Sequence, residues 1–277
     1  MIRAYHQPQR LDDALALLQQ GGQAIAGATG LYSNRKKLDA ELVDITGIGL
    51  STIDVTVDAI RLGATVSLSQ LIGAQLPGSE GAFLAHVARH ITAAPMRNAI
   101  TLGGNIAHPV FWADMPVAFL ALDAELEIGH AGAAPKKIAL GEAIKGQVPW
   151  SNGGLITHIS VPLKKGQALG YERLSRTKND YAYATAAAAM TLESGKAKDV
   201  RVVFGAIQPR AFRATDIEAV LEGKALTPEL IAEAVDKAAA HLPIAPNFRA
   251  SVDYRRQVAC TLARRAIAQA FASAGQE

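Results

Sequence analysis

The sequence predicts an α+β protein built in two parts. Its 277 residues are 49% hydrophobic, which is enough for two modest domains with cores of their own. We expect the first domain at residues 1–163, with subdomains at about 1–55 and 56–163, and a second domain at residues 168–274. The segment Lys164-Lys165-Gly166 lies between them, because a basic, glycine-containing stretch after an apolar strand is typical of a linker.

The first 55 residues alternate between strand-like and helix-like segments. Apolar residues recur at helical spacing from Leu11 to Leu18. The stretch Ala24–Tyr32, AIAGATGLY, is an apolar strand that breaks into a Gly-x-x-Gly turn, and Glu41–Ile45 is a further short strand. Between them, Arg35-Lys36-Lys37 forms either a solvated surface or a phosphate contact.

The middle of the chain leads to a second glycine turn. From Ile60 the sequence predicts a strand, a turn and a helix whose N-cap is Ser67 or Ser69. A helix at Gly81–His90 then precedes the loop MRNAITLGGN, and the apolar run Met115–Leu122 predicts another helix.

The second turn contains two adjacent glycines, Gly103 and Gly104, which could form an anion-binding loop. Glycine has no Cβ, so both residues can take positive φ and turn their N–H groups toward an anion such as a phosphate. The alternative is an ordinary turn between a strand and a helix. Neither glycine turn has the G-x-G-x-x-G spacing of a Rossmann fold, so a dinucleotide would be held by two separated loops.

The second part is expected to contain strands followed by helices. Residues 155–162 predict a strand that ends the first part. The segment 171–192 begins as a strand and continues as an alanine-rich helix or strand, and residues 200–207 predict a strand. The closing helices are expected at Thr215–Glu222, at Thr227–Ala240 with Pro228 in its first turn, and at Tyr254–Phe271.

Composition argues against several classes of protein. The net charge of +3 and the pI of about 9.0 come from scattered Lys and Arg, and aromatic residues make up only 5%, so nucleic-acid binding is not expected. A single cysteine, Cys260, cannot form an internal disulfide or hold an iron–sulfur cluster. No signal peptide or membrane span is visible in the sequence, and we expect a cytoplasmic protein.

Several motifs, spaced in order along nearly the whole chain, resemble one family. They are AGATG at 26–30, PMRN at 95–98, TLGGN at 101–105, Asp114 with Pro116, YER at 171–173 with Arg176 and Asp180, FGA at 204–206 with Pro209-Arg210 and Arg213, and SVDYRR at 251–256. The chain resembles the FAD-binding, medium-sized subunit of the molybdenum hydroxylases, the xanthine dehydrogenase and carbon monoxide dehydrogenase family. This resemblance implies an FAD-binding domain of the PCMH (vanillyl-alcohol oxidase-like) type, followed by a smaller α+β domain with an antiparallel sheet packed on helices.

The resemblance also implies a set of FAD contacts. The residues at those positions are Ala24, Ile25, Ala26, Gly27, Ala28, Thr29, Gly30, Leu31, Ile91, Thr101, Gly103, Gly104, Asn105, His108, Asp114, Ile156 and Arg173. Backbone and hydroxyl groups from Thr101 to Asn105 would hold the pyrophosphate. Ile91 and Ile156 would give apolar contacts. No catalytic residue and no metal ligand is expected in this chain.

Two charged positions have implied roles of their own. The Asp114 carboxylate would accept hydrogen bonds from the cofactor. Arg173 would reach the flavin region, where the family often has Lys; Arg offers a planar fork in place of a point charge. Asp180 is expected to brace Arg173 or Arg176, unless it belongs to a solvated pair. Trp112 either stacks near the flavin or closes its loop onto the body of the protein.

Three positions lie outside the family pattern. Ala28 stands where Gly or Asn is common, and Gly30 stands where Asp, Ser or Glu is common, so one polar contact to FAD is lost. The pattern does not fix His108, and a metal there is not expected because no second ligand follows at suitable spacing. A hydrogen bond within the loop is the simpler role for this imidazole.

The implied function is electron transfer. Electrons from a large subunit with the molybdenum cofactor would pass through [2Fe-2S] clusters of a small subunit to FAD on this chain, and then to NAD⁺, a quinone, O₂ or another carrier. The resemblance suggests a dimer of heterotrimers. The alternatives are a self-contained flavoenzyme with its own substrate pocket, for which no acid–base pair stands out, and a scaffold subunit that has lost the cofactor.

Overall fold

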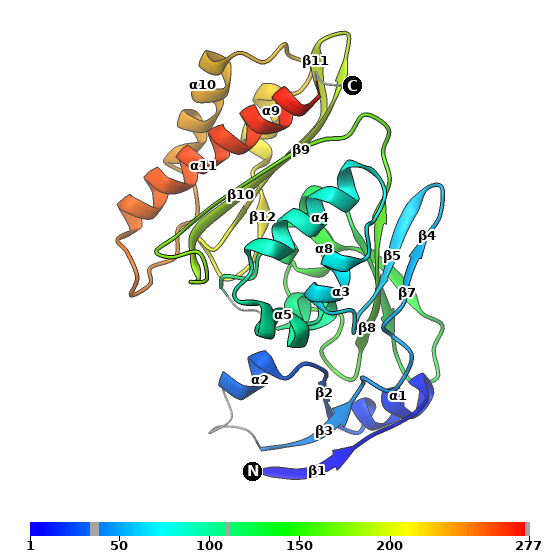
Figure 1. Cartoon of the computed structure of the whole chain (residues 1–277). Coiled ribbons are helices and arrows are strands. Elements are labelled where there is room, and N and C mark those ends of the chain that lie inside the picture. The colour runs from blue at the N-terminus through cyan, green and yellow to red at the C-terminus, as the bar shows by residue number, and fades with distance from the viewer. Residues whose placement is uncertain (34–38, 109–110, 275–277) are drawn as a thin grey trace. The chain divides into compact units, whose positions relative to one another are not determined.

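The computed structural model describes residues 1–33, 39–108 and 111–274, and the chain forms two compact units (Figure 1). Unit 1 comprises Met1–Leu76, Ala93–His108 and Asp123–Pro162; unit 2 comprises Pro77–Thr92, Pro109–Leu122 and Leu163–Glu277. The basic segment 35–37 lies outside the described residues. Within the described ranges, no helix combines the length and the apolar character needed to cross a lipid bilayer.

Unit 1 begins with a small parallel sheet. Its strands β1 (Ile2–His6) and β2 (Gln23–Ile25) both pair in parallel with the central strand β3 (Ala40–Asp44). Helix α1 (Leu11–Gln19) connects β1 to β2 and buries Leu15 and Leu18, as its periodicity predicts. After β2, the chain enters a short helix, α2 (Thr29–Ser33), where the sequence predicts only a turn.

The rest of unit 1 is an antiparallel sheet with short helices. The strand order is β4 (Ile53–Val55), β5 (Ala59–Gly63), β8 (Leu155–Pro162), β6 (Glu125–Gly129) and β7 (Lys136–Ala139). The helices are α3 (Leu68–Gly73), α5 (Ala94–Ala99), α6 (Leu102–Ala107) and α8 (Leu140–Ala143). Ser67 is the N-cap of α3, and its hydroxyl accepts from the Gln70 N–H at 3.2 Å, which confirms one of the two predicted caps.

Unit 2 is organised around an antiparallel sheet of long strands. The order is β12 (Phe212–Arg213), β11 (Lys196–Gly205), β10 (Ala182–Glu193) and β9 (Ala168–Ser175). The alanine-rich segment is therefore a strand, and the predicted strand at 200–207 lies within β11 and the residues just after it. The α+β class, with an antiparallel sheet packed on helices in the C-terminal part, is confirmed.

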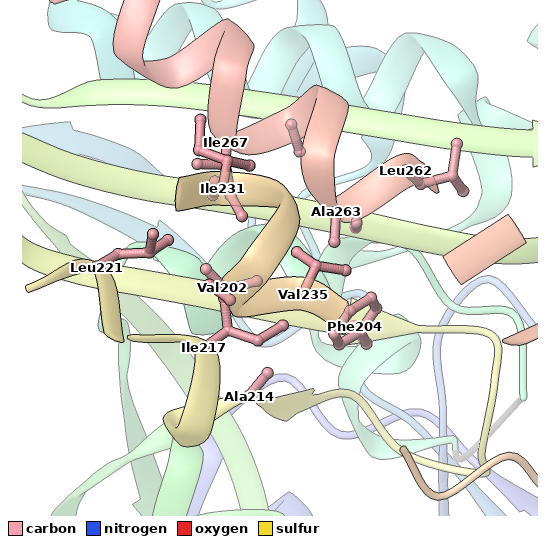
Figure 2. Close-up of a cluster of buried hydrophobic side chains, with 14 of the residues drawn as sticks. Val202, Phe204, Ala214, Ile217, Leu221, Ile231, Val235, Leu262, Ala263 and Ile267 are labelled. Atoms are coloured by element: carbon pink, nitrogen blue, oxygen red, sulfur yellow. The ribbon is translucent and has the colours of Figure 1, made fainter. Parts of the chain in front are cut away.

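Helices cover both faces of this sheet. Val202 and Phe204 of β11 point toward α9 (Thr215–Leu221), α10 (Pro228–Ala239) and α11 (Val252–Ser273), and Figure 2 shows their side chains among apolar residues of these helices. Gly205 lies on the opposite face, where an added Cβ would stand 2.3 Å from Val117 of α7 (Met115–Ala121). On that side α4 (Gly78–His90) packs against α7 and β9.

Arg255 of α11 connects the ends of several segments in unit 2. Its side chain is fully buried, and its guanidinium donates to the backbone carbonyls of Tyr183, Ala206 and Ala245. The guanidinium also lies 5.1 Å from the centre of the Phe111 ring. Carbonyl dipoles and an aromatic face therefore solvate this charge inside the protein.

Candidate cofactor-binding site

The first glycine loop of unit 1 presents unused backbone donors. The N–H groups of Gly27, Ala28 and Thr29 have no acceptor among the residues that the structure describes. Ala28 has a φ of +56°, a left-handed conformation that side chains other than Gly, Asn and Asp rarely adopt. This conformation explains why Gly or Asn suits position 28. A left-handed residue next to a helical one points successive N–H groups to one side, which is the geometry of an anion-binding loop.

Gly27 brings this loop against the second predicted loop. A Cβ at position 27 would stand 1.5 Å from the carbonyl oxygen of Ala99, which is the last residue of α5. Only glycine permits this approach, because the contacted atom belongs to backbone and cannot swing aside. The stretches 24–31 and 101–108 are thus neighbours within unit 1.

The second loop differs from its prediction. Residues 102–107 form helix α6, and neither Gly103 nor Gly104 has a positive φ. The Gly103 N–H donates to the Ala64 carbonyl at 2.8 Å, and the Gly104 N–H donates to the Thr101 hydroxyl at 3.3 Å. The positive φ expected of these two glycines is therefore wrong, and internal acceptors engage both N–H groups. A contact between this stretch and a cofactor stays a prediction.

Close packing explains one of the paired glycines. A Cβ on Gly103 would stand 2.7 Å from the Ala64 side chain, so glycine allows α6 to lie directly on the chain that follows β5. Asn105, on the same helix, has a buried Oδ1 atom without a hydrogen-bond partner among the described residues. A buried acceptor of this kind fits a ligand that carries an N–H or O–H group. The residues of unit 1 thus offer both donors for phosphate oxygens and an acceptor for a neighbouring group.

The other predicted contacts of unit 1 differ in exposure. The short stretch Ala24–Leu31 is half-buried throughout, which leaves surface for a ligand. His108 ends α6 and its ring lies beside Gly30. Ile156 of β8 is 2% exposed and pairs with Ile128 of β6, so the structure places it in the core of the sheet.

In unit 2, Asp114 stands just before α7 as part of a buried polar cluster. It is 2% exposed, and its two carboxylate oxygens accept from the Tyr171 hydroxyl at 3.0 Å and from Arg173 Nε at 3.4 Å. Burial raises the pKa of Asp114 above its usual value, and the positive charge of Arg173 opposes this effect. Burial also raises the pKa of Tyr171 well above its usual value, so its hydroxyl remains a donor.

Several hydrogen bonds hold the Arg173 side chain in place. In addition to Asp114, its guanidinium donates to the Ser175 hydroxyl at 2.7 Å and to the Asp180 carbonyl at 2.6 Å. Asp180 therefore braces Arg173 through its backbone, while its carboxylate pairs with Arg176 at 3.2 Å and with Arg249 at 3.3 Å. The predicted brace is confirmed, and Arg249 is an additional partner.

Ile91 is buried and Trp112 is half-buried in unit 2. Ile91 follows the last turn of α4 and is 8% exposed. The Trp112 ring stacks 4.2 Å from the Tyr181 ring, and the Arg249 guanidinium lies 5.6 Å from it. These contacts agree with the role of Trp112 in closing its loop onto the protein; a contact with flavin stays a prediction.

Two contacts had no local signal in the sequence. Tyr171 and Asp114 are 57 positions apart, and only the place of Tyr171 in the same motif as Arg173 hinted at its importance. Trp150 Nε1 donates to the Ala107 carbonyl at 3.3 Å across 43 positions, and it fixes the end of α6. Among the described residues, no group of three or more His, Cys, Asp or Glu side chains is arranged to hold a metal ion.

Known families match both parts of the chain. The family described as "FAD binding domain in molybdopterin dehydrogenase" matches residues 1–164, and "CO dehydrogenase flavoprotein C-terminal domain" matches residues 170–270. The chain is 30% identical to the 6-hydroxypseudooxynicotine dehydrogenase complex subunit alpha of Paenarthrobacter nicotinovorans, over 94% of this chain and 92% of that protein. It is 27% identical to the glyceraldehyde dehydrogenase medium chain of Sulfolobus acidocaldarius, over 95% and 96%.

Solved structures agree with this relationship. A carbon monoxide dehydrogenase of Hydrogenophaga pseudoflava, in a form that lacks the Mo-pyranopterin moiety, superimposes with a TM-score of 0.92 at 28% identity, over 99% of this chain and 98% of that one. The match extends over both the FAD-binding and the C-terminal parts. The chain belongs to the family of FAD-binding medium subunits of the molybdenum hydroxylases, to which the carbon monoxide and xanthine dehydrogenases belong.

Proposed function

We propose that this chain transfers electrons through bound FAD within a larger molybdenum-containing dehydrogenase. In this proposal, a small subunit with [2Fe-2S] clusters supplies the electrons, a large subunit with the molybdenum cofactor oxidises the substrate, and an external carrier accepts the electrons. The names of the relatives support it, since several are medium chains or subunits of dehydrogenase complexes. We expect a dimer of heterotrimers in the cytoplasm.

One observation carries the cofactor part of the proposal. The N–H groups of Gly27, Ala28 and Thr29 have no acceptor in the described chain, and the left-handed Ala28 directs neighbouring groups to one side. Three donors of this kind match the oxygens of a phosphate. We assign them to the FAD pyrophosphate, in place of the glycine N–H groups of the second loop.

Other residues complete the binding of FAD in this proposal. The residues Ala24, Ile25, Ala26 and Leu31 flank the donors, and the Asn105 amide oxygen accepts from the cofactor. The Thr101 hydroxyl keeps its proton for donation while its oxygen caps α6. From the family resemblance we keep Ile91, Asp114, Ile156 and Arg173 as further contacts. When bound, the isoalloxazine ring supplies the chemistry, because it takes up electrons singly or in pairs.

The first experiment compares absorption spectra of the chain purified alone and with its co-purifying partners, and identifies the flavin released on denaturation. Flavin bands with released FAD, and iron–sulfur absorbance only with partners, are expected. Turnover of a substrate by the chain alone would replace the proposal with a self-contained flavoenzyme. Absence of flavin from both samples would refute it and leave a scaffold subunit.

A matched pair of substitutions tests the loop itself. Ala28→Val places a β-branched side chain at positive φ, which strains the loop and is expected to weaken FAD binding at least tenfold. Ala28→Gly accepts the same φ without strain and is expected to keep the affinity. Circular dichroism of both apoproteins checks that the fold is kept. Equal affinities of the two variants would exclude the loop from the phosphate site.

A further inference from the structure

We propose that Gly30 and His108 act as one unit in which the His108 imidazole takes the place of a side chain at position 30 and donates a hydrogen bond to the diphosphate bound by the first loop. This inference rests on the FAD binding proposed above. It gives His108 a specific role and explains why a polar side chain is missing at position 30.

The geometry of Gly30 is the first step. A Cβ at this position would stand 2.5 Å from His108 Cδ2 and 2.8 Å from His108 Nε2. Gly30 lies in helix α2 and does not have a positive φ, so its backbone conformation is open to any residue. Glycine is unfavourable inside a helix. The reason for glycine here is therefore the imidazole ring that fills the adjoining space.

The state of the imidazole is the second step. Neither ring nitrogen of His108 has a hydrogen-bond partner among the residues that the structure describes, and the residue is half-buried. The backbone around it is well fixed, because the His108 N–H donates to the Gly104 carbonyl at 3.0 Å and Trp150 holds the Ala107 carbonyl. A positioned ring with unused nitrogens is suited to bind a ligand.

The neighbourhood of the ring is the third step. The edge formed by Cδ2 and Nε2 faces Gly30, the residue directly after the unused N–H groups of Gly27, Ala28 and Thr29. An anion bound by those groups would therefore lie beside the residue that this edge of the imidazole faces. Phosphate oxygens accept such a bond strongly, because they carry negative charge. The diphosphate is thus the part of the cofactor that this ring would contact.

The test measures FAD affinity of the apoprotein by quenching of flavin fluorescence in a four-variant cycle. Gly30→Ser must displace the imidazole, and His108→Ala removes it, so we expect each single variant to bind FAD at least tenfold more weakly. In the double variant the Ser side chain enters the vacated space. We expect its affinity to return to within about threefold of the original protein. If the double variant binds FAD more weakly by the product of the two single-variant factors, the inference is overturned.

Further measurements separate this inference from its alternatives. His108→Gln keeps an N–H donor, so we expect it to bind FAD more tightly than His108→Ala does. ADP carries the diphosphate without the flavin, and we expect His108→Ala to weaken ADP binding by the same factor as it weakens FAD binding. His6→Ala serves as the control, because His6 pairs with Glu41 on the surface. If the original protein fails to bind FAD, the proposed function falls. If it binds FAD and His108→Ala binds equally well, only the inference falls.

Discussion

Replacing Tyr171 with Phe tests the buried cluster around Asp114. The substitution removes only the hydroxyl that donates to Asp114 at 3.0 Å, and the two residues are 4% and 2% exposed, so water cannot replace the bond. A hydrogen bond to a charged group is worth about 1.5–3 kcal/mol, and we expect Tyr171→Phe to lower the free energy of unfolding by about 2 kcal/mol at pH 7. The Phe ring keeps the edge contact with Phe83, since the ring centroids are 6.4 Å apart.

Urea denaturation followed by circular dichroism measures this loss, and Asp114→Asn supplies the matched background. With the carboxylate replaced by a neutral amide, we expect the Phe substitution to cost less than about 1 kcal/mol. The loss should also shrink as the pH falls through the pKa of Asp114, which burial raises above its usual value, because protonation removes the charge that strengthens the bond. A loss below about 0.5 kcal/mol at pH 7, or equal losses in both backgrounds, would refute the reasoning.

Three further predictions concern unit 1. Gly27→Ala drives a Cβ into the Ala99 carbonyl and should lower the thermal midpoint markedly; an unchanged midpoint would contradict the packing described for Gly27. Thr101→Val removes the N-cap acceptor of α6 and should cost about 1 kcal/mol in urea, whereas Thr101→Ser should cost little. Burial, followed by the charge of Arg61, lowers the pKa of His158, so the folded protein favours the neutral ring. Stability should therefore fall as the pH drops below about 6.5, and His158→Gln should flatten this fall between pH 7.5 and 5.5; equal slopes would exclude His158 as its source.

Periodicity and capping chemistry predicted much of the fold. The apolar spacing of residues 11–18 places Leu15 and Leu18 on the buried face of α1, and Ser67 caps α3 because its hydroxyl satisfies a free N–H. The helix expected at Met115–Leu122 is α7, whose residues are all buried. These features depend on neighbours in the sequence, and therefore a single sequence suffices to predict them.

The alanine-rich segment shows where local reasoning ends. Ala186 and Ala188 of β10 pack in the core with α11, while Ala187 and Ala189 on the other face are also fully buried. A strand buried on both faces shows no alternation of apolar and polar residues, and alanine favours helices. The sequence of this segment is therefore compatible with either a strand or a helix. Pairing with β9 and β11 decides the outcome, and these partners are distant in sequence.

The candidate site shows the same limit. The motif TLGGN predicted a cofactor contact through its glycine N–H groups. The carbonyls of Val66 and Ala64 accept from the Leu102 and Gly103 N–H groups, and nothing in the motif reveals these acceptors. The donors of the first loop were equally hidden, because their availability depends on which acceptors are missing around them. The contact between Gly30 and His108 likewise arises only when the two stretches meet in the fold.

The order of synthesis gives the closing helix a particular consequence. Strands β9, β10 and β11 leave the ribosome before α11, whose residues cover them and whose Arg255 binds the carbonyls of Tyr183, Ala206 and Ala245. Because the chain is synthesised at roughly 5–20 residues per second, several seconds pass between the synthesis of the strands and that of α11. Alanine side chains along β10 present little apolar surface during that time, which lowers the tendency of the unfinished chain to aggregate. A ribosome-bound chain that stops before Val252 should therefore be open to proteases across the whole of unit 2, and release of the full helix should protect it in one step.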